Sequence, residues 1–428
     1  MERQEALALR REYFMPCVRY FYKDPPLFVR GDMQYLYDER GKKYLDFFAG
    51  VSVMNCGHSN PFIIERVAAQ LGTLQHLTNV YLTEPVLRLA ERLAHVMPGR
   101  PVLPGAAPHG SSGLVSSFFC NSGSEANEGA LLLARLATGK RKFIALNGGL
   151  HGRTYLTQAA TGIPMWRADP FLPSDVYFAD SAADVIAALE KDRNIAAFIC
   201  EPIQGNGGIR PVPPDFFKEI ARPLNDQGAL LIVDEIQSGF ARTGKMFAIE
   251  HYGVVPDIMT MSKALGNGIP IAAFASSKEI ARQFTRPSAS TLGGNPVSAS
   301  AALAVLDYIE QECLCAKAEE NGAYLRARLD TLAAKFPVIK EVRGKGLMLG
   351  AELAFDGGGT TDAGYVDDSA MLTDRILEEL KERGIILGKN GLGRNVLAFQ
   401  PPLVINRGDI DFLIGNLEDI LEGDVLQR

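Results

Sequence analysis

The sequence predicts an α/β protein, with a mostly parallel, doubly wound large domain and a smaller α+β domain. Between residues 116 and 276, short apolar runs recur, each followed by turn residues and a helical pattern: SSFFC, KFIAL, AAFIC, ALLIV, DIMTM and IAAFAS. Runs that are continuously apolar, rather than alternating, indicate strands covered on both faces, as in a parallel sheet between two helical layers. After residue 316, a different mixture of helices and strands, with a Gly- and Asp-rich loop at 356–368, indicates the α+β unit.

Three segments are expected along the chain. Residues 1–60 form an N-terminal segment that joins the small domain, residues 61–315 form the large domain, and residues 316–428 form the C-terminal small domain. Alternating apolar residues around Glu39-Arg40-Gly41 predict a β-hairpin in the first segment. His58, in the irregular loop after this hairpin, is either a ligand or base or, as we prefer, a structural hydrogen-bonding residue.

Composition and charge disfavour several classes of function. The 428 residues carry a formal net charge of -6, which argues against nucleic acid as a partner because phosphate binding needs a basic face. No apolar run approaches the roughly 18–20 residues of a membrane span, so no membrane association is expected. The six cysteines show no CxxC spacing, which disfavours a metal site and a disulfide framework. The N-terminus mixes acids and bases without a long apolar core, and we expect a cytoplasmic protein.

Candidate functional groups follow the predicted strands, which is where ligands bind in open α/β sheets. SSFFC is followed by NSGSEAN and a helical pattern, so Gly123 and Ser124 open a helix whose free backbone N–H groups form an anion site. Ser122 with Glu125 also fits a capping box. From this motif alone, the two interpretations are equally good.

Two acids and a lysine follow three other predicted strands. Asp234 follows ALLIV, Glu201 follows AAFIC, and Lys263 follows DIMTM. A buried acid needs a cationic partner, and a buried lysine with a lowered pKa forms a Schiff base with a carbonyl. Taken singly, each acid is more simply a helix cap, and the lysine a surface residue that opens a helix. Together with the anion site, they suit pyridoxal 5′-phosphate (PLP), which has a phosphate, a ring nitrogen and an aldehyde.

A longer set of motifs runs in order along nearly the whole chain: YLDFFAG, NSGSEAN, HGRT, EPIQG, DEIQSGFARTGKMFA, PDIMTMSKALGNGIP, TLGGNP and RGKGLMLG. This set resembles the class III, ω-amino-acid type aminotransferases, which are fold-type I PLP enzymes, and within them the alanine–glyoxylate aminotransferase 2-like branch. The resemblance implies ping-pong transfer of an amino group from an ω-amino acid or primary amine to a keto acid (pyruvate, glyoxylate or 2-oxoglutarate). A phospho-lyase, aminomutase or decarboxylase of the same fold is the alternative.

The resemblance also implies roles for individual residues. Lys263 is the Schiff-base lysine and moves the proton during catalysis, and Asp234 is the partner of the ring nitrogen. Gly123 and Ser124 hold the phosphate, joined by Thr291 from the neighbouring subunit of a homodimer.

Four more residues are implied around the cofactor ring. Gln237 is expected near the phenolic oxygen, and Glu201 and His151 are expected close by. Leu150 stands where the family usually has Tyr or Phe stacked on the ring. No metal ion is expected.

Two positions depart from the family pattern in a way that bears on the substrate. Ala398 replaces the arginine that binds a carboxylate, and Asn206 replaces the glutamate that pairs with this arginine. Alanine cannot grip a carboxylate with two parallel hydrogen bonds as a guanidinium does. We therefore expect that the α-carboxylate of glutamate is not held in the usual way, and Arg394 is our candidate for gripping the acceptor.

Overall fold

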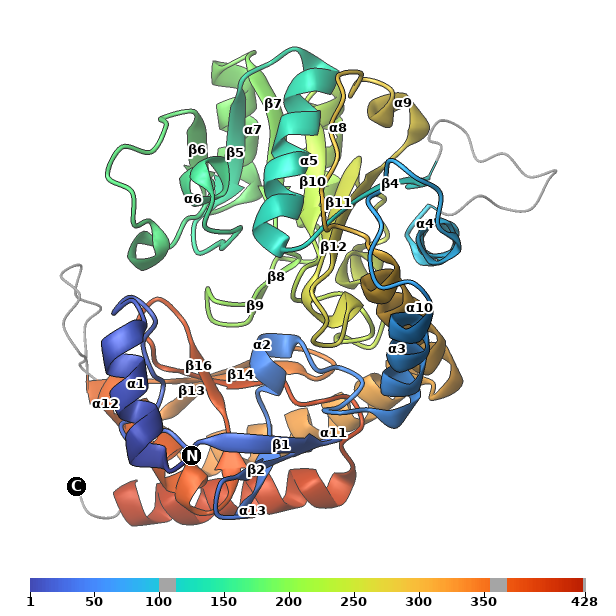
Figure 1. The fold of residues 1–428 in the computed structure, drawn as a ribbon. Coiled ribbons are helices and arrows are strands. Elements are labelled where there is room, and N and C mark those ends of the chain that lie inside the picture. The colour runs from blue at the N-terminus through green and yellow to red at the C-terminus, as the bar shows by residue number, and fades with distance from the viewer. Residues whose placement is uncertain (100–112, 355–367, 426–428) are drawn as a thin grey trace.

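The computed structural model describes residues 1–99, 113–354 and 368–425, which form one large sheet, smaller sheets and the helices that cover them (Figure 1). The loop expected at 356–368 lies almost wholly outside the described residues. None of the helices in the described ranges is long and apolar enough to cross a membrane.

The large sheet has seven strands in the order β4-β12-β11-β10-β7-β5-β6. The strands are β4 (Ser116–Cys120), β5 (Lys142–Leu146), β6 (Val176–Ala179), β7 (Ile195–Cys200), β10 (Leu230–Asp234), β11 (Ile258–Met261) and β12 (Ala272–Ser276). Only β12 runs antiparallel to its two neighbours. The six apolar runs found in the sequence are all strands of this sheet, and the predicted α/β class is confirmed. The prediction misses β6, a four-residue edge strand that is mostly half-buried.

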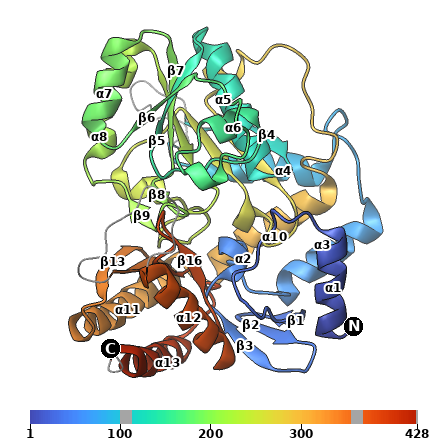
Figure 2. The ribbon, with the colours of Figure 1, turned by 90° about the vertical axis from the view of Figure 1, so that its left-hand side faces the viewer.

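Helices cover both faces of the large sheet. Figures 1 and 2 show α5 on one face and α7 and α8 on the other. The helices of this part are α3 (Pro61–Thr73), α4 (Glu84–Val96), α5 (Gly123–Thr138), α6 (Tyr155–Ala159), α7 (Ala182–Lys191), α8 (Phe216–Gln227), α9 (Lys278–Ala281) and α10 (Pro296–Gln311). Three 3₁₀ turns lie at Pro164–Trp166, Ala248–Tyr252 and Lys263–Leu265.

The N-terminal residues share a sheet with the C-terminal part. After α1 (Arg3–Tyr13), strands β1 (Phe28–Asp32), β2 (Tyr35–Asp38) and β3 (Lys43–Asp46) form an antiparallel meander, and β15 (Ile385–Ile386) adds to β3 in parallel. The predicted hairpin is therefore β2–β3. The short turn α2 (Ala49–Ser52) follows it.

A second four-stranded sheet, in the order β13-β14-β17-β16, lies in the C-terminal part. Its strands are β13 (Ile339–Lys345), β14 (Met348–Leu353), β16 (Gly388–Asn390) and β17 (Val396–Phe399), and its helices are α11 (Leu314–Lys335), α12 (Asp368–Glu382) and α13 (Arg407–Val425). The two-stranded ribbon of β8 (Ile203–Gln204) and β9 (Arg210–Pro211) extends from the large sheet towards this part (Figure 1). The domain limits at 60 and 315 stay a prediction.

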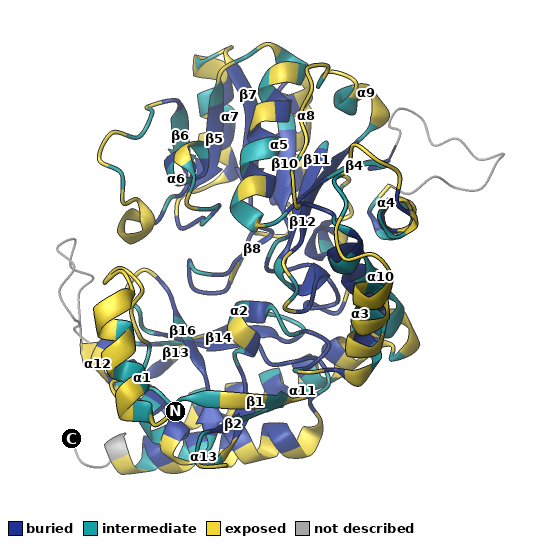
Figure 3. Cartoon of the chain, in the orientation of Figure 1, coloured by how far each residue is buried: buried dark blue, intermediate teal, exposed yellow. Residues whose placement is uncertain are grey.

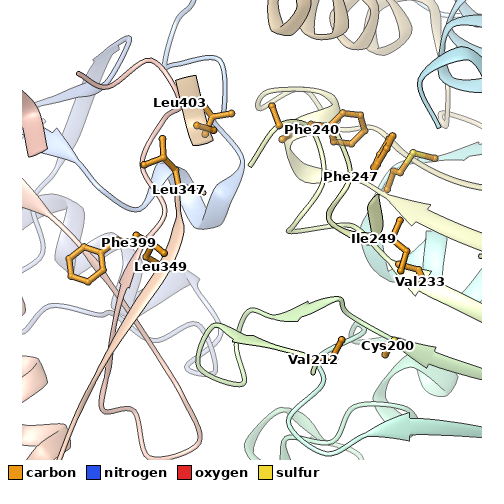
Figure 4. Close-up of a cluster of buried hydrophobic side chains, with 14 of the residues drawn as sticks. Cys200, Val212, Val233, Phe240, Phe247, Ile249, Leu347, Leu349, Phe399 and Leu403 are labelled. Atoms are coloured by element: carbon orange, nitrogen blue, oxygen red, sulfur yellow. The ribbon is translucent and has the colours of Figure 1, made fainter. Parts of the chain in front are cut away.

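The core runs through both parts of the chain. Figure 3 shows that the inner strands of the large sheet are buried while the outer faces of the helices are exposed. One hydrophobic cluster includes Phe240 and Phe247 beside the large sheet and Leu347 and Phe399 of the C-terminal sheet (Figure 4). A shared apolar core therefore links the two parts.

Candidate active site

The N-terminus of α5 follows β4 directly. Ser122 caps the helix, because its Oγ accepts the N–H of Glu125 at 3.3 Å while the Glu125 carboxylate accepts the N–H of Ser122 at 3.0 Å. This capping box does not use the N–H groups of Gly123 and Ser124. The two interpretations of the motif are therefore compatible, and the positive end of the helix is available to an anion.

Asp234, at the end of β10, is the centre of a buried hydrogen-bond network. Its Oδ2 accepts the side-chain amide of Asn127 at 2.7 Å and lies 2.8 Å from Nδ1 of His151. Asn127 also donates to the carbonyl oxygen of His151 at 2.7 Å and accepts the hydroxyl of Thr260 at 2.7 Å. The Oδ1 atom of Asp234 accepts the backbone N–H of Ile236 at 3.0 Å. The network thus fixes the orientation of the carboxylate.

The charge of this network is partly balanced within it. Burial lowers the pKa of His151, but the hydrogen bond to Asp234 and the charges of Asp234 and Glu201 outweigh burial and raise it. The environment therefore favours a protonated imidazole beside the buried carboxylate.

Lys263 follows β11 and opens a 3₁₀ turn with φ 46°, in the left-handed region that non-glycine residues seldom adopt. Burial lowers the pKa of its ammonium group, while the charges of Glu201 and Asp234 oppose this shift. A lowered pKa increases the fraction of neutral amine, which is the nucleophilic form. Strained backbone of this kind is concentrated at functional sites.

Glu201 follows β7 and binds two backbone segments at once. Its carboxylate accepts the N–H of Leu150 at 2.9 Å and the N–H of Gly205 at 3.0 Å. Burial and the charge of Asp234 raise the pKa of Glu201, against the charge of His151 and these two hydrogen bonds. Glu201 therefore holds the HGRT segment and the loop after β8 at the same edge of the sheet.

Two buried donors in this site lack partners within the described residues. They are Nε2 of Gln237 and Nε2 of His151. Buried polar atoms are nearly always hydrogen-bonded, so these two indicate a ligand. A Cβ at Gly205 would lie 1.9 Å from Oε1 of Gln237, so only glycine fits against this side chain. An anion site, an oriented acid, a lysine with lowered pKa and unpaired donors are the groups that PLP needs.

The remaining predicted residues differ in how far they are buried. Thr291 is exposed in the single chain. Asn206 is half-buried, and its carbonyl oxygen accepts the N–H of Gly391 at 3.0 Å. Ala398 is fully buried in a small apolar cluster. Arg394 is half-buried at the tip of the β16–β17 hairpin, and its guanidinium lies 5.4 Å from the ring centroid of Phe21.

Sequence reasoning did not assign Asn127, Thr260 or Gly205 to the site. Asn127 does lie in the NSGSEAN motif, where a polar side chain on the buried face of an otherwise apolar helix is a usable signal. Thr260 and Gly205 give no such signal. The described ranges contain no group of three or more His, Cys, Asp or Glu side chains that could bind a metal ion.

The fold and the site together match the α/β enzymes that bind PLP. The family model described as aminotransferase class-III matches residues 22–421. The chain is 40% identical over 427 residues to alanine–glyoxylate aminotransferase 2 homolog 2, mitochondrial, of Arabidopsis thaliana, covering 95% of this chain and 85% of the relative. It is 38% identical over 429 residues to the acetylornithine aminotransferase of Methanocaldococcus jannaschii, covering 98% of both. The crystal structure of the ornithine aminotransferase of Toxoplasma gondii ME49 matches with a TM-score of 0.87 at 28% identity, covering 100% of this chain and 97% of that one.

The chain belongs to the class III aminotransferase family. Class III aminotransferases depend on PLP, and this chain is accordingly a PLP-dependent aminotransferase of fold type I that moves an amino group from an amine to a keto acid. The lyase, aminomutase and decarboxylase alternatives are not favoured by these relatives.

Proposed function

We propose that Lys263 is the residue that holds PLP covalently and that Asp234 faces the ring nitrogen. The observation that carries this proposal is a lysine with a lowered pKa and an oriented acid at the ends of two adjacent parallel strands, β11 and β10. When bound, PLP supplies an aldehyde that condenses with amines and a ring that withdraws electrons. Nζ of Lys263, in its neutral form, accepts the proton that the substrate gives up and later returns it. Asp234, held by Asn127, keeps a negative charge towards the ring nitrogen.

The other groups hold and orient the cofactor in this proposal. The N–H groups of Gly123 and Ser124 bind the phosphate at the positive end of α5. Gln237 donates its unpaired Nε2 to the phenolic oxygen. Leu150 covers the ring with an aliphatic side chain. His151 and Glu201 act on the cofactor from close by through their charges.

Borohydride reduction of the purified enzyme, followed by proteolysis and mass spectrometry, tests the covalent role. We expect the pyridoxyl group on the peptide that contains Lys263. The Lys263→Ala variant should bind no reducible cofactor, whereas Lys245→Ala, in an exposed position, should label like the wild type. A label on another lysine would refute the assignment.

We further propose a homodimer in which Thr291 completes the phosphate site of the partner subunit. Thr291 is exposed in the single chain, and so are the large apolar side chains of Val80, Tyr81, Leu82 and Leu292. Clustered exposed apolar side chains are typical of subunit interfaces.

Mixing two variants, one that lacks Lys263 and one that lacks Thr291, tests this arrangement. In a Lys263→Ala/Thr291→Ala heterodimer, one site has both native residues if Thr291 acts on the partner, so mixing the two variants after mild dissociation should restore activity. If Thr291 acts within its own chain, no mixed site is native. Activity no higher than the sum of the separate variants would contradict the proposal.

We propose that the amino donor is an ω-amino acid or a primary amine rather than glutamate. Ala398 packs with Ile203, Ile209 and Met348, so the position is apolar and carries no cation for a carboxylate. Asn206 replaces the glutamate that would pair with such a cation, so no acid at this position needs one. An apolar wall favours donors whose carboxylate is distant or missing.

Steady-state rates with glutamate, β-alanine, 4-aminobutyrate and simple amines test this donor class. The wild type should prefer the last three. The double variant Asn206→Glu/Ala398→Arg should gain activity with glutamate by about tenfold or more, because a bidentate pair becomes possible. The single variant Ala398→Arg is the control, and it should lose stability because its buried charge has no partner. Efficient glutamate turnover by the wild type would overturn the proposal.

For the acceptor carboxylate, we propose Arg394. Burial lowers the pKa of its guanidinium, while the charge of Asp374 opposes this shift, so the cation is incompletely solvated. Arg394→Lys should raise the KM for pyruvate while leaving the half-reaction with a simple amine unchanged. An unchanged KM would remove Arg394 from this role.

We also propose a cytoplasmic location. All six cysteines are free, as thiols are in reducing compartments. Fractionation of cells that express the chain tests this, and recovery in an organelle fraction would contradict it.

A further inference from the structure

The loop of residues 205–208, which follows β8, is held by the C-terminal part of the chain. Three donors of that part bond to three carbonyl oxygens of this one loop. The bonds are Asn390 Nδ2 to Gly205 at 3.0 Å, Gly391 N to Asn206 at 3.0 Å, and Arg343 Nε to Gly208 at 2.8 Å. The C-terminal part therefore binds three of the four residues of this loop.

On its other side, the same loop contacts Glu201 and Gln237, two residues of the proposed PLP site. The N–H of Gly205 donates to Glu201 at 3.0 Å, and the Cα of Gly205 lies so close to Gln237 that an added Cβ would be 1.9 Å from its Oε1. A Cβ at Gly207 would lie 2.5 Å from the carbonyl oxygen of Gly148. The loop has no room to shift towards the site without displacing these groups.

Asn390 is the side chain that connects the C-terminal part to the residue of the loop that contacts Glu201 and Gln237. It lies at the end of β16, is 4% exposed, and bonds to the same residue, Gly205, that contacts Glu201 and Gln237. A buried amide held to a carbonyl in this way transmits displacement because close-packed groups move together.

We propose that Asn390 is a positioning residue, through which the C-terminal part sets the placement of Glu201 and Gln237 against the cofactor. The proposal rests on the proposed roles of these two residues. Movement of the C-terminal part relative to the large sheet then changes the electrostatics of the PLP site through this loop.

The charges around Glu201 give the physical reason. Burial raises the pKa of Glu201, the charge of Asp234 raises it further, and the charge of His151 and the hydrogen bond from Gly205 lower it. The charge of Glu201 in turn raises the pKa of Lys263. If the loop relaxes, that hydrogen bond weakens and the pKa of Glu201 rises further. Less negative charge then faces Lys263, and Gln237 loses the surface that holds its amide in place.

The variant Asn390→Ala tests the proposal in the PLP-bound enzyme and in the apoenzyme. We expect PLP to bind about fivefold to tenfold more weakly, as follows from losing one buried hydrogen bond that orients charged groups. We also expect the visible absorption band of the bound cofactor to shift relative to the wild type. Gly205→Ala, which displaces Gln237 from the other side, should shift the band as well.

Asn395→Ala is the matched control. Asn395 lies in the same β16–β17 hairpin and donates its side-chain amide to the carbonyl oxygen of Leu353 at 2.7 Å, within the C-terminal part. Both variants should lose similar thermal stability, but only Asn390→Ala should change the band and the PLP affinity. Equal changes in both variants, or none in Asn390→Ala, would overturn the inference. A wild type that shows no cofactor band would instead refute the proposed function itself.

Discussion

Asn127 determines which way the Asp234 carboxylate faces. Its amide and the His151 ring both bind Oδ2, which leaves Oδ1 with a single backbone donor, that of Ile236. Oδ1 is therefore the oxygen with free acceptor capacity. A neutral amide orients the acid without adding charge. An arginine or lysine at this position would add a positive charge.

Replacing Asn127 with alanine is expected to weaken PLP binding by about tenfold, because hydrogen bonds to charged groups contribute roughly 1.5–3 kcal/mol. Titration of the apoenzyme with PLP measures this. Thr260→Val, which removes only the hydroxyl that orients Asn127, should have a smaller effect. Wild-type affinity in Asn127→Ala would show that His151 and the N–H of Ile236 are sufficient to orient Asp234.

Glu235 is the second buried acid after β10, and it serves stability rather than the site. Its carboxylate accepts the hydroxyl of Ser238 at 2.5 Å and the N–H of Ile249 at 2.7 Å. Burial raises its pKa to about 7, against these hydrogen bonds. Because the folded pKa lies above the unfolded value, the contribution is fully present below pH ~4.5 and is lost as the pH rises through about 7.

Glu235→Gln should therefore flatten the pH dependence of stability between pH 5 and 8, by at most about 3 kcal/mol. Urea unfolding across this range measures the effect. Glu219→Gln, at an exposed position on α8, should leave the slope unchanged. A slope in Glu235→Gln equal to that of the wild type would mean that the buried acid keeps an ordinary pKa.

At the level of elements, α2 is a left-handed turn. Ala49, Gly50, Val51 and Ser52 all have φ between 50° and 67°. Left-handed conformation destabilises non-glycine residues by roughly 1–2 kcal/mol each. Asp46 offsets this strain, because its Oδ1 accepts two N–H groups at the start of the turn while Nε2 of His58 lies 2.7 Å from its Oδ2. His58 is thus a structural hydrogen-bonding residue, as preferred from the sequence.

Asp46→Ala is expected to lower the free energy of unfolding by about 2–4 kcal/mol, because buried N–H groups and a strained turn lose their acceptor. Asp184→Ala is the control. Asp184 also accepts two backbone N–H groups, at 3.1 and 3.0 Å, but at the exposed start of the ordinary helix α7. The control should cost about 1 kcal/mol. Equal losses would argue that α2 stores no strain.

For the whole molecule, Arg242 connects three parts of the chain. It is fully buried, and its guanidinium donates to the carbonyl oxygens of Leu347 at 3.0 Å and Pro401 at 2.6 Å and to the side chain of Asn55. Burial lowers its pKa to about 9. The N-terminal segment, the large sheet and the C-terminal part therefore meet at one cation.

Arg242→Lys should destabilise the protein by roughly 3–5 kcal/mol, since a single ammonium cannot reach all three acceptors and leaves buried carbonyls unpaired. Arg210→Lys, at an exposed ion pair with Glu352, should change stability by less than about 1 kcal/mol. Urea unfolding of both variants compares them. Similar losses would show that Arg242 is not a joint between the parts.

Much of the fold and part of the site are predictable from local pattern. Lys263, Asp234 and Glu201 each follow a continuously apolar run, and parallel strands bring their carboxyl ends to one edge. The short edge strand β6 is missed, because four residues, three of them half-buried, give little periodicity. The position of Arg394 relative to the site cannot be predicted from the residues next to it in the sequence, because its proposed role depends on its surroundings in the fold.

The sequence by itself determined the α/β class, the family and the strand-end position of the lysine, because apolar periodicity and motif order are local properties. Only the tertiary structure decided that Asn127 orients Asp234 across 107 residues and that Asn390 reaches Gly205 across 185. Such contacts depend on how helices and sheets pack, and an asparagine carries no local mark of the distant partner to which its amide will bond.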